Sequence, residues 1–511
     1  MSNMSIALNR FGLGARPGEA APADPILWLT AQMAAFQPAP PALTGVPTRR
    51  AVATELADFY EELREVQRDL RQQGLGRRAR RAQGAQAMNA GAMASQVPAG
   101  QMMGGEAAAD PNDELAGLPR QLRRYIRGES RAAYLAMVGA RANAALATPA
   151  PFVERLVHFW ANHFAVSIDK LPVIGLAGLL ELEAIRPHVL GKFRDMAMAV
   201  LQHPAMLLYL DQAQSIGPAS PVMERFGDRP ALRRAGLNEN LAREVLELHT
   251  LGVGGGYGQA DVTELARALT GWTVSGLTRG RGARLAGVDG EPGDFAFAAA
   301  IHEPGPRTLL GRTYRQEGQA QAAAIVADLA AHPATARHLA TKLARHFAGD
   351  TPPPALVQRL ERTYLESDGD LPSLYRALIA APEAWAEQPV KFKSPWEWSV
   401  SALRALGTRE IEGQAVAGLM NQLGQPIWRP GSPAGWDDIA SAWAGPDALL
   451  RRVEAAERMA SRAGNAIDAR QLANRILPGA VSPMTAQAIE RAESPGQGLA
   501  LLLVAPEFLR R

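Results

Sequence analysis

The stretch NENLAREVLELHTLGVGGGYGQADVTELARALTGW, residues 238–272, holds two helical patterns on either side of a glycine-rich turn. In its first half, apolar residues recur at i, i+4 and i+7, the spacing of one helix face, at Leu241, Val245 and Leu248. Asn238 stands where an N-cap residue is favoured, and glycines follow the last apolar position. We therefore predict one helix from Asn238 to Leu251.

A second helix is predicted directly after the turn. Asp261 and, three residues later, Glu264 resemble a capping box, and an apolar face follows before Gly271. The two helices would form a hairpin around the glycines at 254–256, because glycine suits a tight connection. The unpaired N–H groups at the start of the second helix could equally hold an anion, so both interpretations of the turn stay open.

The whole chain of 511 residues has a composition that favours helix over sheet, with 47% hydrophobic and only 6% aromatic residues. We predict a mainly α, large multi-helix protein with a small irregular or β-containing flap at about residues 274–315. Residues 1–70 are expected to form an N-terminal helical segment and 71–113 a flexible low-complexity insertion. Residues 114–511 are expected to form the main helical domain, packed with the N-terminal segment.

Charge and cysteine content exclude several protein classes. The 54 basic and 51 acidic residues give a formal net charge of +3, so nucleic acid is not an expected partner. The absence of cysteine excludes disulfides and thiolate chemistry. Without a run of 18 apolar residues or a charged start before an apolar core, we expect neither a membrane span nor a secretory signal. The expected location is the cytoplasm, and co-export to the periplasm with a partner is the alternative.

Polar residues of the first predicted helix gather on one flank. At about 100° per residue, Asn240, Glu244 and Glu247 fall together with Arg243 beside them, whereas His249 faces the apolar side. Two neighbouring carboxylates can act as an acid–base pair, which makes this the candidate catalytic set: Asn240, Arg243, Glu244, Glu247 and His249. Glutamates on helix surfaces are more often solvated or paired with arginine, so a structural role is the competing interpretation.

The same region could hold a divalent metal, since carboxylate and imidazole groups are its common ligands. The candidate ligands are His163, Glu244, Glu247, His249 and His302. His158 is excluded as a partner of His163, because a separation of five residues turns them about 140° apart on a helix. His302 lies in an irregular loop, where polar side chains often serve function. For His163 the competing interpretation is a buried histidine hydrogen-bonded to backbone beside Trp160 and Phe164.

Several segments together resemble the bacterial family called domain of unknown function 1800, over nearly the whole chain apart from residues 71–113. They are LNRFGLGARPGE from Leu8, FWANHFAVS from Phe159, HPAMLLYLDQAQSIGPAS from His203, the 238–272 block, HPATARHLATKL from His332, KFKSPWEWSVSALRALG from Lys391 and the tail APEFLRR. The resemblance implies a largely helical protein without a settled activity. It also implies a gene neighbour encoding a sulfatase-like protein of the domain of unknown function 1501 family. The family usually has histidine or a similar residue where Ala161 stands, and an Asp-like residue where Gly254 stands.

Two function classes follow from these observations. The first is a scaffold that docks the sulfatase-like partner, and the alternative is a metal-dependent or acid–base hydrolase with a site around the 238–272 hairpin. A third interpretation has the polar block tying helices together by buried hydrogen bonds. The chain contains no GxxxxGK[ST], GxSxG or HExxH motif, which disfavours P-loop nucleotide hydrolysis, the usual serine hydrolase plan and a zincin site.

Overall fold

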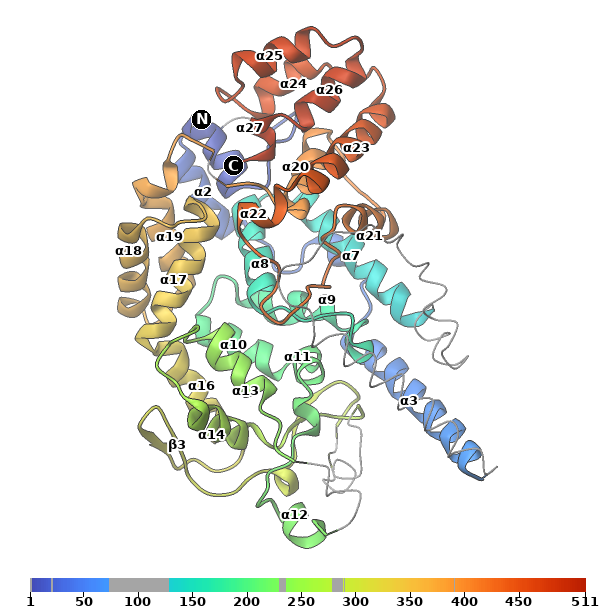
Figure 1. The fold of residues 1–511 in the computed structure, drawn as a ribbon, viewed down its shortest axis with the longest axis vertical. Helices are drawn as coiled ribbons and strands as arrows, with labels where there is room; N and C mark the ends of the chain where they lie inside the picture. Colours follow the sequence, from blue (N-terminus) through green and yellow to red (C-terminus); the bar gives the residue numbers. More distant parts are fainter. Residues whose placement is uncertain are drawn as a thin grey trace.

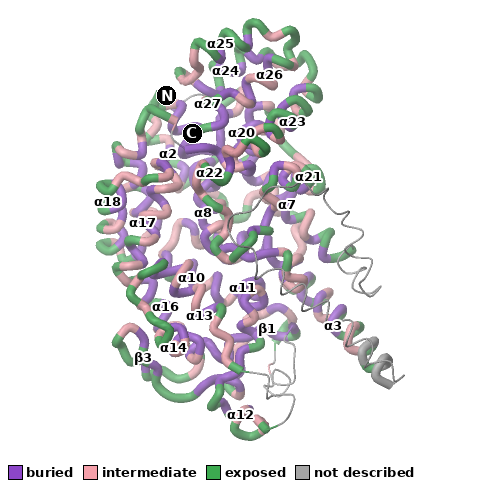
Figure 2. Tube along the Cα trace, in the orientation of Figure 1, coloured by how far each residue is buried: buried purple, intermediate pink, exposed green. Residues whose placement is uncertain are grey.

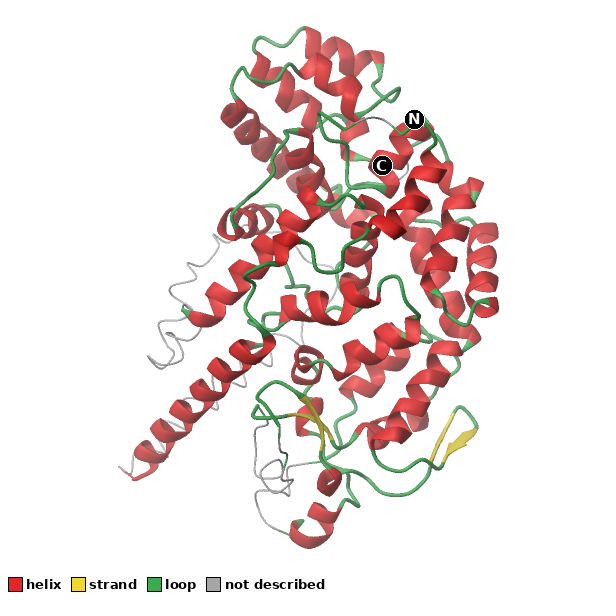
Figure 3. Ribbon diagram, turned by 180° about the vertical axis from the view of Figure 1, so that it is seen from behind, coloured by secondary structure: helices red, strands yellow, loops and turns green. Residues whose placement is uncertain are grey.

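The computed structural model describes residues 2–19, 22–72, 128–228, 236–277, 288, 290–389 and 391–511. These residues form a mainly helical molecule with two short antiparallel sheets, which confirms the predicted fold class (Figures 1 and 3). The predicted insertion at 71–113 lies almost entirely outside the described residues. The proposed domain boundaries there stay a prediction.

Most helices of the first half of the chain form the middle and much of the lower part of the molecule (Figure 1). Their bounds are α1 (Asn3–Ile6), α2 (Pro25–Ala35), α3 (Arg49–Gln72), α7 (Glu129–Ala147), α8 (Pro151–His163), α9 (Ala177–Leu179), α10 (Phe193–Gln202), α11 (Pro204–Tyr209), α12 (Pro221–Phe226), α13 (Asn240–Glu244) and α14 (Gln259–Leu269). Three further segments are π-helical, with a wider turn than an α-helix: η1 (Ala7–Phe11), η4 (Leu180–Ile185) and η7 (Val245–His249).

The second half of the chain adds one flank and one end of the molecule. Its helices are α16 (Gln319–Ala331), α17 (Pro333–Ala348), α18 (Pro354–Glu366), α19 (Leu371–Ala380), α20 (Pro395–Ala405), α21 (Gly413–Gln422), α22 (Ala440–Trp443), α23 (Pro446–Ala463), α24 (Ala469–Ile476), α25 (Pro483–Glu490), α26 (Pro495–Leu503) and α27 (Pro506–Leu509). Many begin with proline, whose fixed φ and missing N–H suit the first helical position. Within the described residues, no helix is both long and apolar enough to cross a membrane.

Two apolar cores hold these helices, and buried residues run along the facing sides of the helices (Figure 2). The larger core joins both halves, from Ile6 to Trp428. The smaller core is made by α23 to α27 together with Leu8 near the start of the chain. Asn9 reinforces this contact by donating a hydrogen bond to the carbonyl of Ile476 (3.1 Å). Residues from both ends of the chain therefore share one core. This core fixes the positions of C-terminal segments that take part in the site described below.

The helical hairpin exists, but its details differ from the prediction. The first helix begins at Asn240 and continues as the π-helix η7 from Val245, so residues after Glu244 are rotated relative to a regular helix. Asn238 accepts a hydrogen bond from the Asn240 N–H (2.9 Å). The second helix begins at Gln259, because the carboxylate of Asp261 accepts from the N–H of Gly258 (2.8 Å). Asp261 thus completes the cap as the third helical residue instead of being the N-cap itself.

The predicted flap, at about 274–315, contains three of the four strands that the structure describes, and the remaining strand ends where the flap begins. Strand β1 (Trp272–Val274) pairs antiparallel with β2 (Phe295–Phe297), and β3 (Arg307–Leu309) pairs with β4 (Arg312–Tyr314). The turn between β3 and β4 needs positive φ at Leu310 (50°) and Gly311 (76°), and Asp261 fixes it by accepting from the N–H of Leu310 (2.7 Å). The flap is therefore tied to the start of α14.

Candidate functional site

The carboxylates predicted to be catalytic lie half-buried on the first helix of the hairpin. Burial, and next the neighbouring Glu247, raise the pKa of Glu244 above its ordinary value. Arg243 pairs with Glu239 (3.3 Å) and bonds to Gln259 (3.1 Å). Asn240 is exposed. The set therefore divides into a half-buried carboxylate pair and a separate arginine network that ties the two helices of the hairpin together.

The predicted histidines His163 and His249 come together with a third, His338 of α17. His163 donates from Nε2 to the carbonyl of His249 (3.1 Å), and His338 donates from Nε2 to that of Leu248 (3.1 Å). The ring of His163 lies 6.2 Å from that of His249 and 6.1 Å from that of His338. The expected neighbours Trp160 and Phe164 both contact His163. This bears out the buried, backbone-bonded geometry weighed as the structural interpretation.

Burial keeps these histidines uncharged at neutral pH. Burial and, next, the nearby Lys342 amine lower the pKa of His249 to about 3 and that of His338 to about 4. The pKa of His163 falls well below 6.5 for the same two reasons. Neither ring nitrogen of His249, nor Nδ1 of His163, has a hydrogen-bond partner among the described residues.

His302 lies elsewhere, against the end of α14. Its Nδ1 donates to the carbonyl of Thr270 (2.8 Å), and Glu303 beside it accepts from the N–H of Ala219 (2.6 Å). In the part of the chain that the structure describes, no group of three or more histidine or acidic side chains is arranged to hold a metal ion. The metal and catalytic roles assigned to the sequence-predicted residues stay predictions.

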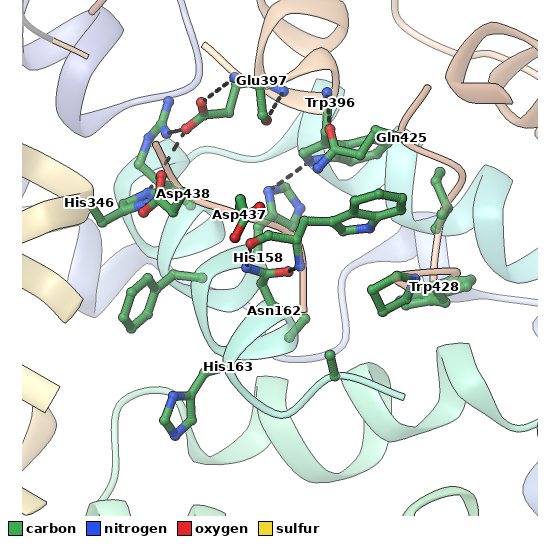
Figure 4. A pocket seen from close by; sticks show the side chains of 18 of the residues that line it. His158, Asn162, His163, His346, Trp396, Glu397, Gln425, Trp428, Asp437 and Asp438 are labelled. Atoms are coloured by element: carbon green, nitrogen blue, oxygen red, sulfur yellow. Dashed lines mark hydrogen bonds and ion pairs between the residues drawn. The ribbon is translucent and has the colours of Figure 1, made fainter. Parts of the chain in front are cut away.

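A pocket of about 330 Å³ opens beside this histidine cluster (Figure 4). Its walls are α8, α17, the start of α20 and the irregular segment 424–439 between α21 and α22. Such a volume is at the lower end of what small-molecule sites enclose. His163 lines the pocket, so one predicted residue belongs to it. The side chains of Trp396, Trp428 and Trp436 supply flat apolar surfaces.

Segment 424–439 is held over the pocket by Asn162. The Asn162 side chain accepts from the N–H of Trp436 (2.7 Å) and donates to its carbonyl (2.8 Å). Gly435 has a φ of +83°, and a Cβ there would clash with the Asn162 carbonyl. On the other side, the guanidinium of Arg141 lies 4.2 Å from the ring centroid of Trp396, while Glu181 accepts from its Nε (2.9 Å). The residues on both sides of the pocket are therefore held in fixed positions by these contacts.

A buried charge network forms the upper wall. Glu397 accepts from Arg155 and from Arg511 (2.8 Å), and its other oxygen caps α20 through the N–H of Ser394 (2.9 Å). Burial alone would raise the pKa of Glu397, but Arg511 and Arg155 outweigh it and hold this pKa far below its ordinary range. The carboxylate is therefore ionised at neutral pH.

Asp438 is the second carboxylate of this wall and faces the pocket with 31% of its side chain exposed. It accepts from Nδ1 of His346 (2.8 Å) and lies 3.1 Å from the amine of Lys391. Burial opposes ionisation, but His346 and Lys391 prevail and lower the pKa of Asp438. Burial lowers the pKa of His346 to about 4, so the pair carries one negative charge at neutral pH.

Two cations on α17 line the same pocket without such compensation. For Lys342, no hydrogen bond or ion pair with any described residue is present, and burial lowers its pKa to about 8. Arg345, one turn further on, also forms no ion pair within the described residues, and its buried Nε has no partner. The pocket thus combines a fixed anionic wall with two unpaired cations.

The match to known families settles what the chain resembles. A family model described as "Protein of unknown function (DUF1800)" matches residues 6–510. The chain belongs to the DUF1800 family. No curated protein and no solved structure matches it.

The segments on which the DUF1800 resemblance rests also line the pocket. FWANHF supplies Asn162 and His163, HPATARHLATKL supplies Lys342, and KFKSPWEW supplies Trp396 and Glu397. Ala161, where the DUF1800 family usually has histidine or a similar residue, is itself part of the lining. Gly254, the other departure, is exposed in the hairpin turn. Four of the seven segments, that of Leu13 included, therefore contribute residues to the lining of this pocket.

Sequence reasoning missed most of the DUF1800 pocket. Lys342, His346, Glu397 and Asp438 were not singled out, and Glu244 and Glu247 do not line it. One signal was present on α17, because polar residues recur at i, i+4, i+7 and i+8: His338, Lys342, Arg345 and His346. A basic face with this spacing is equally typical of a solvated helix surface, so the pattern alone did not indicate a site.

Proposed function

We propose that the protein is an enzyme that performs acid–base catalysis in this pocket, with Lys342 as the residue that exchanges the proton. The observation that carries the proposal is the Lys342 amine, which lies on the pocket wall without a partner among the described residues. A surface lysine is protonated and solvated, whereas this one is mostly enclosed and has a pKa of about 8. General acid–base catalysis is most efficient when the pKa of the group lies near the working pH.

The surroundings support this assignment. At pH 7 roughly a tenth of the Lys342 amines would be uncharged and able to accept a proton, because the pKa of about 8 lies only one unit above this pH. Asp438 stays ionised nearby and favours the return of a proton to the amine. The neighbouring His163 is neutral and offers no competing charge. This proposal keeps the acid–base hydrolase predicted from the sequence but moves its site from the hairpin to the pocket.

Hydrolysis is the reaction class to test first, with p-nitrophenyl acetate and p-nitrophenyl phosphate as chromogenic substrates. We expect Lys342→Met to lower kcat/KM at least 100-fold, because removal of a general acid or base typically has an effect of about 10²–10⁴-fold. The wild-type rate should rise with pH, reach half of its maximum near pH 8 and level off above it. Lys170→Met is the matched control, since that amine pairs with Asp211 (2.6 Å) outside the pocket. Equal activity in Lys342→Met and wild type would rule the assignment out.

We also propose that a separate surface docks a sulfatase-like protein of the domain of unknown function 1501 family. The observation in its favour is a pair of exposed apolar side chains three residues apart on α23. Leu450 is 57% and Val453 37% exposed, and this spacing puts them on one helix face. Isolated apolar residues are common on surfaces, so only an adjacent pair of this kind supports a contact.

Co-expression tests the docking proposal. We expect the sulfatase-like protein to co-purify with the wild-type chain and to be lost with the double variant Leu450→Asp and Val453→Asp. Leu365→Asp on α18, also exposed (42%), serves as the control and should retain the partner. Purification of the wild-type chain alone from cells that express both proteins would argue against docking.

A further inference from the structure

The pocket face of α17 carries more positive charge than the protein neutralises. Lys342 and Arg345 are three residues apart, so they lie on the same side of the helix. Each is close enough to influence the other, because Arg345 contributes to lowering the pKa of Lys342. Like charges at this spacing destabilise a helix, and an enclosed cation without a partner adds a further desolvation cost.

The acids that line the pocket do not remove this excess. Glu397 is already shared between Arg155 and Arg511, and Asp438 is shared between His346 and Lys391. Asp437, exposed at the rim, forms no ion pair with any described residue. The guanidinium of Arg345 therefore faces the pocket unpaired, with a buried Nε that has neither a protein acceptor nor free access to solvent.

We propose that Arg345 binds the oxyanion group of the pocket's ligand, a carboxylate, phosphate or sulfate. Guanidinium matches these groups in shape and charge, and charge-assisted hydrogen bonds to them are among the strongest in proteins. A bound oxyanion would give the Arg345 guanidinium the counter-charge that it lacks among the described residues and would offset the repulsion between Arg345 and Lys342. The inference rests on the proposed function only in taking the same pocket as the substrate site.

The remaining walls define the other end of the ligand. Trp396, Trp428 and Trp436 line the pocket with aromatic surface, which suits a flat or apolar group. A volume of about 330 Å³ limits the ligand to a small molecule. The substrate class is therefore a small organic anion that joins an apolar or aromatic body to an oxyanion.

Three probes separate these contributions by isothermal titration calorimetry at low salt: phenyl phosphate, benzoate and the neutral benzyl alcohol. We expect phenyl phosphate or benzoate to bind the wild type at least tenfold more tightly than benzyl alcohol. Arg345→Gln should weaken anion binding roughly tenfold or more, in line with charge-assisted hydrogen bonding. Arg345→Lys keeps the charge and should retain part of the affinity. Arg337→Gln is the control on the same helix, because that side chain is 69% exposed and lies outside the pocket.

Each outcome decides the inference. Equal binding of anions and benzyl alcohol by the wild type, or anion affinity unchanged in a folded Arg345→Gln variant, would overturn it. If Arg345→Gln fails to fold, the wild-type comparison of charged and neutral probes and the Arg345→Lys titration still decide. Loss of anion binding in a folded Arg345→Gln variant, with binding retained in Arg337→Gln, supports the inference. Failure of the catalytic proposal would appear separately, as hydrolysis that does not depend on Lys342.

Discussion

Glu397→Gln is expected to destabilise the protein by roughly 3–5 kcal/mol, the usual effect of removing one partner from a buried ion pair. The amide keeps the shape of the side chain but leaves Arg155 and Arg511 without a counter-charge in the interior. These two arginines keep only 2% and 0% of their side chains exposed, so water cannot replace the carboxylate. The unfolding midpoint in urea, measured at pH 7, checks this effect.

The pH dependence gives an independent check. The pKa of Glu397 is lowered in the folded state. The ionised carboxylate therefore makes its full contribution to the free energy of unfolding above pH 4.5, the ordinary pKa, and this contribution is lost as the pH falls below 4.5. The stability difference between wild type and Glu397→Gln should therefore shrink below pH 4.5. Glu361→Gln is the control, because its partner Arg337 is 69% exposed and surface pairs contribute about 0–1 kcal/mol. If Glu397→Gln and Glu361→Gln lowered the free energy of unfolding equally, the buried network would contribute no more to stability than a surface ion pair.

Lys342→Met is expected to act in the opposite direction and to raise stability at pH 7 by roughly 1–3 kcal/mol. The pKa of this amine falls from 10.5 to about 8 on folding, because burial disfavours its charged form. Each unit of such a shift corresponds to about 1.36 kcal/mol, reduced here by the water that the pocket admits. Methionine has a similar length without the charge. Urea denaturation of the wild type and the variant measures the difference.

The sign of the pH dependence is fixed by the lowered pKa. Below pH 8 the buried ammonium group lowers the free energy of unfolding of the wild type by its full amount. This loss of stability disappears as the pH rises from 8 towards 10.5. The advantage of Lys342→Met should therefore be largest at neutral pH and vanish near pH 10.5. A variant less stable than wild type at pH 7 would show that the amine has a compensating partner. Higher stability together with lost activity is the pattern expected of a functional residue.

The sequence predicted the elements of the fold better than their local geometry. The hairpin at 238–272 and the flap followed from apolar spacing and glycine content, which act over a few residues. The π-helix at Val245–His249 did not, because its apolar residues satisfy a regular helical period as well. Asp261 was predicted as the N-cap of the second helix but is its third helical residue, so the predicted helix start lies three residues too late in the chain. A carboxylate at either position gives a similar sequence pattern.

The site was less predictable for a different reason. His163 was a candidate because imidazole is a common metal ligand. The pocket around it draws on α8, α17, α20 and segment 424–439, which are neighbours only in three dimensions. A carboxylate such as Glu397, within an apolar and aromatic sequence, resembles an ordinary capping residue and does in fact cap α20. Its second function as the counter-charge of two arginines is visible only after folding.

The charge network also determines when the pocket comes into existence. Arg155 and Glu397 are 242 residues apart in sequence, and Arg511 reaches back 165 residues to the carbonyl of His346. Contacts between such distant residues form late, because closing a long loop lowers the entropy of the chain before the contact contributes any stabilising free energy. A partly folded molecule can therefore have most of its helices and still lack any place for a ligand. Ligand binding would report completion of the entire fold, and a small molecule that fits the pocket would favour the last step of folding.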